Sequence, residues 1–193
     1  MSPAQPVEPP EGDGEDEGHG NTSAVVELDA EPEPTPEPEG RAGYKRPESV
    51  LVVVLTWSGE FLLLRRSEPT GFWQSVTGSL EAGEGARLAA VRELREETGL
   101  QVSPSRLVDL HRGERFPILP AWRARYAPGV RYNQEHWFAL MLPGRRLIRL
   151  HPGDHLEYRW VPARQAAFLT SSWTNRKAIL ALDQMRMSPG YLR

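Results

Sequence analysis

Three glutamates in the middle of the chain have the residue type and the spacing to bind a metal ion. Glu93, Glu96 and Glu97 lie in a run of good helix formers, residues 86–98, which ends before Gly99. Residues three and four apart share one side of a helix, so the three carboxylates would lie together and repel one another. A hard divalent cation such as Mg²⁺ takes carboxylate oxygens and commonly bridges them to substrate phosphates. The spacing therefore indicates a metal site suited to phosphate chemistry.

The helix alone also has a simpler interpretation, namely an exposed face with ion pairs to Arg92 and Arg95. The surrounding residues favour the site, because the segment matches the pattern G-x5-E-x7-R-E-U-x-E-E-x-G-U, where U is bulky and apolar. The nine specified positions are Gly78, Glu84, Arg92, Glu93, Leu94, Glu96, Glu97, Gly99 and Leu100. Nine specified positions over 23 residues are far more specific than a lone glycine motif.

This motif resembles that of the Nudix hydrolases. The resemblance implies an α/β fold, a Nudix-type α/β/α sandwich with a mixed sheet. Such a fold holds a divalent metal, usually Mg²⁺ with Mn²⁺ as a substitute, against a diphosphate. By position it assigns metal binding to Glu93 and Glu97, and metal binding or general-base catalysis to Glu96. Arg92 would belong to the catalytic group and pair with Glu84. Gly78, Glu84 and Gly99 would be structural positions of the motif.

Four flanking segments extend the resemblance to nearly all of residues 44–182. They are YKRP at 44–47, FWQSVTG at 72–78, RYAPG at 125–129 and SWTNR at 172–176. Together they look like the dihydroneopterin triphosphate diphosphatase branch, whose members remove pyrophosphate from dihydroneopterin triphosphate in folate biosynthesis. Members of that branch also accept nucleoside triphosphates such as dATP.

The branch implies further site residues. The positions that match substrate contacts are Lys45, Arg65, Thr77, Ser172 and the loop residues Phe116, Pro117, Ile118 and Leu119. Lys45 and Arg65 can offset triphosphate charge, and the two hydroxyls can donate hydrogen bonds. Asp154 matches an additional acidic metal ligand, with Glu157 as the alternative. His151 and His155 are interpreted as ordinary loop histidines, because imidazole is not a preferred Mg²⁺ ligand.

Charge divides the 193-residue chain into two parts. Residues 1–40 carry twelve acidic residues and no Lys or Arg, which leaves 23 basic and 14 acidic residues from 41 onward. We predict a disordered acidic tail rich in Pro, Glu and Gly over 1–43, and one Nudix hydrolase domain over 44–193. The basic domain suits an anionic small-molecule triphosphate. No dedicated nucleic-acid fold is recognisable, so no nucleic-acid partner is expected, and the oligomeric state stays open.

The absence of cysteine excludes disulfides, thiolate zinc sites and a cysteine nucleophile, and it fits a reducing compartment. The most apolar run, Val50 to Leu55, is far shorter than the roughly 20 residues that span a bilayer. A cytoplasmic protein without a membrane partner is expected.

Hydrophobic periodicity predicts the elements that would position these residues. Strands are expected at 49–56, 60–66, 73–76, 107–112, 136–142, 147–150 and 158–161, with the first two joined as a hairpin. Helices are expected at 86–98, 163–169 and 174–185, the last capped by Thr174.

The leading hypothesis is a Mg²⁺-dependent enzyme that cleaves dihydroneopterin triphosphate to its monophosphate and pyrophosphate. A general (deoxy)nucleoside triphosphate pyrophosphatase is the nearest alternative, which the motif alone supports equally. A non-catalytic nucleotide-binding regulatory module is less favoured, because such a module predicts damaged carboxylates and all three are present.

Overall fold

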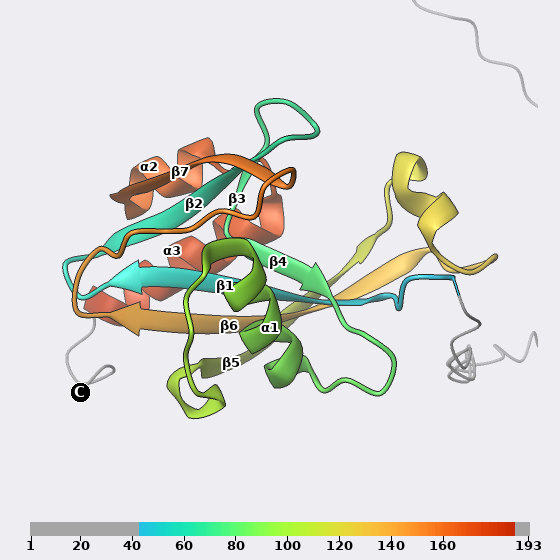
Figure 1. Cartoon of the computed structure of the whole chain (residues 1–193), viewed down its shortest axis with the longest axis horizontal. Coiled ribbons are helices and arrows are strands. Elements are labelled where there is room, and N and C mark those ends of the chain that lie inside the picture. The colour runs from blue at the N-terminus through green and yellow to red at the C-terminus, as the bar shows by residue number, and fades with distance from the viewer. Residues whose placement is uncertain (1–42, 188–193) are drawn as a thin grey trace, which may run out of the picture. The chain divides into compact units, whose positions relative to one another are not determined.

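A seven-stranded mixed sheet forms the centre of the protein, whose computed structural model describes residues 43–187 (Figure 1). The strands are β1 (Glu48–Thr56), β2 (Glu60–Arg66), β3 (Trp73–Gln74), β4 (Val76–Ser79), β5 (Val108–Pro117), β6 (Tyr132–Leu142) and β7 (His155–Pro162). Their order is β3-β2-β1-β6-β5, with β4 paired to β1 and β7 paired to β2. Only β1 and β6 run parallel, and every other pair is antiparallel.

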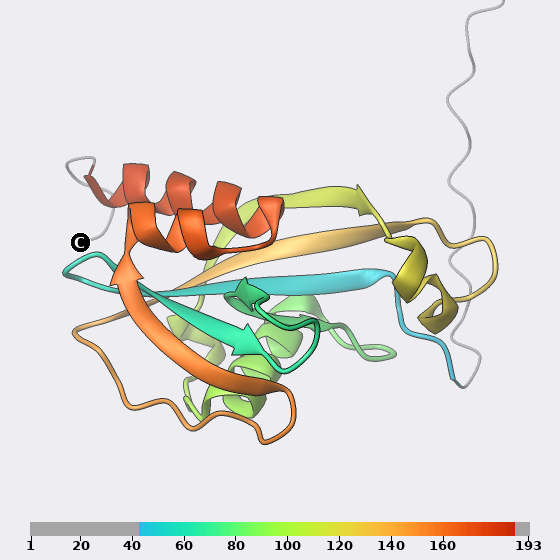
Figure 2. The same ribbon diagram turned by 90° about the horizontal axis from the view of Figure 1, so that it is seen from above.

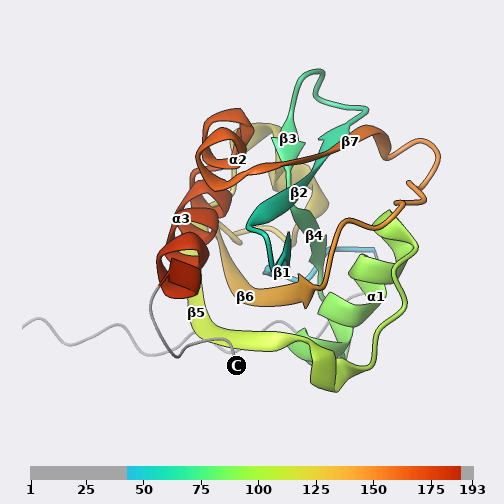
Figure 3. The same cartoon turned by 90° about the vertical axis from the view of Figure 1, so that its left-hand side faces the viewer.

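Helices cover both faces of the sheet. The helices are α1 (Ala86–Thr98), α2 (Ala163–Leu169) and α3 (Trp173–Met187), and short 3-10 turns occupy Pro104–Arg106 and Pro120–Arg125. Helix α1 lies on one face, and α2 and α3 lie on the other (Figure 3). Side chains of β1 alternate between the two layers, with Val50, Val52 and Val54 toward α1 and Leu51, Val53 and Leu55 toward α2 and α3. The expected α/β/α sandwich is therefore confirmed.

One edge of β1 is shared by two strands, and this division places the candidate site. At its carboxyl end β1 pairs with β2, through Leu55 and Phe61. Nearer its start, β1 pairs with β4 over the four positions from Ser49 to Val52. Since β4 has only β1 as a partner, its other edge is free to meet side chains of α1.

Five expected strands need correction, two of which, at 136–142 and 158–161, begin earlier, at Tyr132 and His155. The strand expected at 73–76 is divided into β3 and β4, because Ser75 bonds to α3 in place of a neighbouring strand. Residues 147–150 form no strand. Ile148 is buried in the α1 layer, and the Arg149 amide donates to the Thr98 carbonyl (2.9 Å), so the apolar pattern there reflects packing beside α1. The expected strand at 107–112 starts at Val108 and continues to Pro117.

The start of α3 also differs from the expectation. The helix begins at Trp173, and the Ser172 hydroxyl, in place of Thr174, accepts a hydrogen bond from the Asn175 amide (3.4 Å). The predicted acidic tail, residues 1–43, lies outside the described residues except for Gly43, as do residues 188–193. No helix within 43–187 has the length and apolar character to cross a membrane.

A buried asparagine in α3 holds the corner between β3 and β4. The Asn175 Oδ1 atom accepts hydrogen bonds from the Ser75 amide (2.9 Å) and the Thr170 hydroxyl (2.8 Å). Its Nδ2 atom donates to the Ser75 hydroxyl (2.9 Å). The side chain therefore connects α3 and the segment before it to the strand that lies beside α1.

We predict that Asn175→Ala lowers the free energy of unfolding by about 2 kcal/mol, because it leaves the buried Ser75 amide without an acceptor. Urea denaturation measures this change. Lys177→Ala on the exposed side of the same helix removes only a surface ion pair and serves as the control, with an expected loss below about 1 kcal/mol. Equal losses in the two variants would contradict the anchoring role.

Candidate active site

The Glu93 side chain of helix α1 lies against the backbone of β4 at Gly78. A Cβ atom added at Gly78 would lie 1.8 Å from the Glu93 Cδ atom. The Glu93 carboxylate is therefore packed directly against the strand backbone. This contact gives the first glycine of the motif a physical reason.

An arginine of α1 ties the loop before the helix to the helix itself. Arg92 donates to both carboxylate oxygens of Glu84, from Nε to Oε1 (3.0 Å) and from Nη2 to Oε2 (2.8 Å). It also donates to the Ser79 carbonyl (3.0 Å). These bonds hold the pKa of Glu84 below its usual value. A bidentate, charge-assisted pair of this kind fixes geometry as well as charge, so it braces the loop in the way the motif predicts.

Glu93 is a half-buried carboxylate with one charged donor. Arg92 Nη1 donates to its Oε1 atom (2.7 Å), and its side chain is only 14% exposed. Burial raises the pKa of Glu93, and the neighbouring charge of Glu96 raises it further. Arg92 and the positive charge of Lys45 act in the opposite direction. Lys45, which precedes β1, thus lies where its charge reaches the acidic face of α1.

Glu97 is buried more deeply and has fewer donors. The Thr77 backbone N–H on the free edge of β4 donates to Oε2 (3.3 Å), and the His155 Nε2 atom lies 3.9 Å from Oε1. Burial raises the pKa of Glu97 well above its usual value, with added repulsion from Glu93 and Asp154. The charge of Arg66 lowers the same pKa. A carboxylate with so little compensation carries a large cost when it is ionised.

His155 is the first residue of β7, so its interpretation as an ordinary loop histidine is wrong. Its side chain is 1% exposed, and neither ring nitrogen has a hydrogen-bond partner among the described residues. Burial, followed by the charge of Arg66, lowers its pKa to about 4. The imidazole beside Glu97 is therefore neutral at pH 7.

The other acidic candidates are more exposed. Glu96 lies 3.3 Å from Arg92 Nη1 and 3.7 Å from Arg95 Nη2. Asp154 is bonded to His151, with 2.7 Å between Oδ2 and Nδ1, yet its charge is felt at Glu97.

The alternative to Asp154 is engaged elsewhere. The Glu157 carboxylate pairs with Arg65 (3.1 Å) and Arg159 (2.7 Å). Of the two candidates, Asp154 is thus the one whose charge acts on Glu97.

The donor set fits a hard divalent cation in chemistry. Within 43–187, no three acidic or histidine side chains already converge closely enough to enclose an ion. Glu93 and Glu97 are nevertheless a half-buried and a buried carboxylate, four residues apart on one helix, and the charge of Glu93 raises the cost of ionising Glu97. A cation with oxygen preference would offset both burial and repulsion. Binding would exchange the contacts of Arg92 with Glu93 and Glu96 for contacts to the ion.

Three of the expected substrate residues lie instead toward the α2 and α3 side of the sheet. Thr77 lies on β4, where its hydroxyl accepts from Gln74 Nε2 (3.0 Å). Ser172 lies before α3, with its hydroxyl 2.9 Å from that of Thr174. Arg65, near the end of β2, is paired with Glu157, whereas the next residue along the strand, Arg66, is the cation that acts on Glu97.

The expected loop 116–119 is not one continuous surface. Phe116 and Pro117 end β5, Ile118 is only 3% exposed, and Leu119 is 57% exposed. Ile118 is therefore a packing residue, while the side chains on either side of it are more accessible.

Sequence reasoning missed Arg66 and the placement of His155. Strand alternation puts Arg66 on the opposite face of β2 from Arg65, toward α1, and this alternation is the signal that could have found it. The burial of His155 follows from pairing of β2 with β7, which the local sequence does not reveal.

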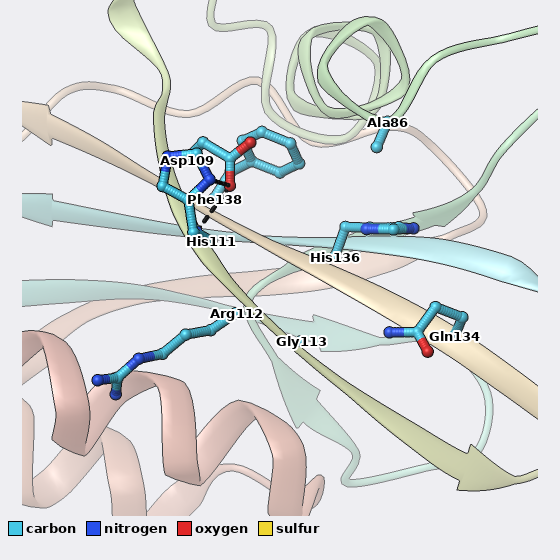
Figure 4. Close-up of a pocket in the computed structure, with 8 residues that line it drawn as sticks. All are labelled: Ala86, Asp109, His111, Arg112, Gly113, Gln134, His136 and Phe138. Atoms are coloured by element: carbon cyan, nitrogen blue, oxygen red, sulfur yellow. Dashed lines mark hydrogen bonds and ion pairs between the residues drawn. The ribbon is translucent and has the colours of Figure 1, made fainter.

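A separate hollow of about 320 Å³ lies beside the start of α1, over β5 and β6 (Figure 4). It is lined in part by Ala86, Asp109 and His111, and none of the α1 carboxylates reaches it. At its rim the Asp109 carboxylate accepts from the His111 amide (2.8 Å), which supports a positive φ of 48° at His111. This hollow is distinct from the acidic face of α1.

The part of the chain described above is also the part that is similar to known proteins. A model of the NUDIX domain matches residues 45–182. The dihydroneopterin triphosphate diphosphatase of Escherichia coli is 48% identical over 139 residues, which cover 70% of this chain and 91% of that protein. The Haemophilus influenzae protein of the same name is 38% identical, covering 70% of this chain and 87% of its own.

Among solved structures, that of the E. coli dihydroneopterin triphosphate pyrophosphohydrolase matches with a TM-score of 0.66 and 47% identity. The match covers 72% of this chain and 95% of that one. Sequence and fold thus agree over the same domain.

The raised pKa of Glu97 predicts an unusual pH dependence of stability in metal-free buffer. From the ordinary pKa of about 4.5 up to the raised value, the folded protein binds more protons than the unfolded chain. The unfolding free energy therefore falls as pH rises through this window. We predict that Glu97→Gln is more stable than the parent at pH 7 by on the order of 1 kcal/mol or more, and that this gain disappears near pH 4.

Urea denaturation in EDTA between pH 4 and pH 8 measures this effect. Glu96→Gln, which changes an exposed carboxylate on the same helix, is the control and should alter stability by less than about 0.5 kcal/mol. A Glu97→Gln protein that is less stable than the parent at pH 7 would show that the carboxylate is well compensated.

Proposed function

The chain belongs to the Nudix family of hydrolases, and we propose that it cleaves dihydroneopterin triphosphate to dihydroneopterin monophosphate and pyrophosphate. One observation supports this choice of substrate. The E. coli dihydroneopterin triphosphate diphosphatase is 48% identical to this chain over 91% of its own length. The reaction adds one water across the anhydride bond between the first and second phosphates.

Nudix hydrolases generally use divalent metal ions, and we propose Mg²⁺ here, with Mn²⁺ as a substitute. Glu93 and Glu97 would be the main ligands, with Glu96 and Asp154 as further ligands. When bound, the cation neutralises phosphate charge and lowers the pKa of a bound water. The support for this assignment is that the buried Glu97 carboxylate has one backbone donor and only the charge of Arg66 to offset its own, so a cation would stabilise it.

The chain's own side chains would bind and orient the substrate. Lys45 and Arg65 would offset the charge of the triphosphate, and the hydroxyls of Thr77 and Ser172 would donate hydrogen bonds to its oxygens. Glu96 would accept a proton from water, and its being the most exposed of the three helix carboxylates supports this role. No covalent intermediate with the enzyme is needed.

The nearest alternative is a general (deoxy)nucleoside triphosphate pyrophosphatase, because the α1 carboxylates serve any diphosphate equally. We favour the pterin substrate on the flanking segments that surround the motif. We also propose that 44–193 is the catalytic domain, that 1–43 is an acidic extension, and that neither nucleic acid nor membrane is a partner. The proposed setting is the cytoplasm, which a cysteine-free chain suits.

Turnover of competing substrates tests the proposed function. The enzyme with Mg²⁺ should show a kcat/KM for dihydroneopterin triphosphate more than about tenfold above that for dATP or dCTP, which corresponds to about 1.4 kcal/mol in transition-state binding. Pyrophosphate release measures both reactions. A preference of the same size for a deoxynucleoside triphosphate would favour the alternative.

The role of Glu97 is tested in the same assay. Glu97→Gln should fold and lose at least about a hundredfold in kcat at saturating Mg²⁺, because the change weakens a metal ligand without changing side-chain size. Glu81→Gln, which changes an exposed carboxylate in the loop before α1, is the control and should keep near-normal turnover. Near-normal turnover of Glu97→Gln would reject the assignment.

A further inference from the structure

A band of polar side chains lies on the α3 side of the sheet, beyond the end of the apolar core. Trp137 on β6 and Leu51 on β1 point into the core beneath α3. Two residues earlier on each strand, the same face presents Glu135 and Ser49, which are register partners. Toward the start of these two neighbouring strands, polar side chains therefore replace the apolar side chains of the core.

Helices α2 and α3 cover only one end of this face. Viewed from above, they lie over one half of β1 and β6, and the other half runs on toward the segment 120–125 (Figure 2). The polar band begins where this cover ends. Thr174, in the first turn of α3, donates a hydrogen bond to Glu135, which is the first residue of the band.

Glu135 is a buried carboxylate that the proposed hydrolysis does not use. It is 6% exposed and accepts from the Trp137 indole nitrogen (2.8 Å) and from Thr174. Burial raises its pKa. It has no ion pair with a lysine or arginine among residues 43–187, and its neighbour across β5, Glu114, is paired with Lys177. A carboxylate accepts about four hydrogen bonds, so Glu135 has acceptor capacity to spare.

Asn133 adds an unsatisfied acceptor on the same face. It is 3% exposed, and its Nδ2 atom donates to the Ser49 hydroxyl (2.6 Å). Its Oδ1 atom is buried with no hydrogen-bond partner within the described part of the chain. Buried polar atoms of this kind are rare and require an explanation. Glu135 thus has acceptor capacity beyond its two donors, and the Asn133 Oδ1 atom beside it has no donor.

An aromatic side chain flanks these acceptors. Phe116 on β5 is the register partner of Asn133, so it lies on the same face, and it is half-buried. An aromatic face beside polar acceptors is suited to a flat heterocycle, which stacks on the ring and presents its N–H edge.

The band is also connected to the acidic face of α1. The Thr77 amide donates to Glu97, whereas strand pairing places the Thr77 side chain beside Leu51, on the α3 side. From β4 through β1 to β6 there are two strand spacings, or roughly 10 Å. A molecule whose phosphates lie at the β4 edge can therefore extend its ring over β1 to β6.

Resting on the proposed function, we propose that Glu135 and Asn133 select the ring of the substrate by accepting hydrogen bonds from a 2-amino-4-oxo-pyrimidine edge. That edge has one ring N–H and one amino group, which together offer three N–H donors. The Glu135 carboxylate accepts from the ring N–H and one amino hydrogen, and the Asn133 Oδ1 atom accepts from the other.

This arrangement discriminates between heterocycles. Dihydropterin and guanine share the 2-amino-4-oxo edge, so both satisfy the acceptors. Adenine presents a ring-nitrogen lone pair next to its amino group, and this lone pair would face the carboxylate. Hypoxanthine keeps the ring N–H but lacks the amino group. A site built around buried acceptors rejects analogues that leave them unpaired.

Comparison of dGTP with dITP tests the inference, since the two differ only in the 2-amino group. The parent enzyme should show a kcat/KM for dGTP at least tenfold above that for dITP. Glu135→Gln, which keeps side-chain size and an acceptor for Trp137, should reduce this ratio to within about threefold. Glu114→Gln, the neighbouring carboxylate on β5, is the matched control and should keep the parent ratio.

A parent enzyme that does not discriminate, or a Glu135→Gln enzyme with the full ratio, would overturn the inference. Thermal unfolding and turnover of dITP show whether the variant is folded. If it is not, Glu135→Asp keeps the charge, shortens the side chain and should also lower the ratio.

Dihydroneopterin triphosphate is assayed in parallel to separate the two claims. Preferred hydrolysis of this compound with an unchanged dGTP to dITP ratio in Glu135→Gln keeps the proposed function and rejects the ring contact. Failure to hydrolyse it, with a ratio that depends on Glu135, rejects the proposed substrate and retains the ring contact.

Discussion

The structure depends on the burial of an acidic helix face against the free edge of a short strand. Gly78 allows the Glu93 carboxylate to touch the β4 backbone, and the Thr77 amide is the nearest donor to Glu97. Burial of carboxylates is costly unless charge and hydrogen bonds compensate for it. Arg92 supplies part of this compensation to Glu93 but has no contact with Glu97. The fold thus gathers costly carboxylates at one edge of the sheet, where a bound cation would offset their burial and their mutual repulsion.

The same edge joins two chemically different faces of the sheet. On the α1 side lie the carboxylates, with the neutral His155 and the charge of Arg66 beside them. On the α3 side, β4, β1 and β6 present polar side chains that end at Glu135. Thr77 belongs to both sides, since its amide meets Glu97 while its side chain faces α3. In the proposed function, the phosphates would bind on the first side and the ring on the second.

Local sequence was sufficient to predict the elements whose start, end and periodicity are set by their own residues. The helix 86–98, with Gly99 in a left-handed conformation at its end, was predicted with its bounds, and so was the strand 60–66. The wrong strand at 147–150 arose because burial beside a helix produces the same apolar pattern as a sheet.

The remaining differences come from contacts that are distant in sequence. The break at Ser75 requires Asn175, which is one hundred residues away. His155 is buried only because β7 pairs with β2, and Glu135 gains its importance from neighbours on β5 and in α3. The motif therefore indicated the chemistry of the site, while the ring-facing residues needed the fold.

Titration of Mn²⁺ into the metal-free protein tests the central claim most directly. Because Mn²⁺ is paramagnetic, the amount bound to the protein can be measured without any substrate. The account predicts saturable binding that releases protons, since a carboxylate with a raised pKa must lose its proton to become a ligand. It also predicts at least tenfold weaker binding to Glu97→Gln than to the parent. Equal binding by the two proteins, or no saturable binding to the parent, would contradict the assignment of the buried helix face as the metal site.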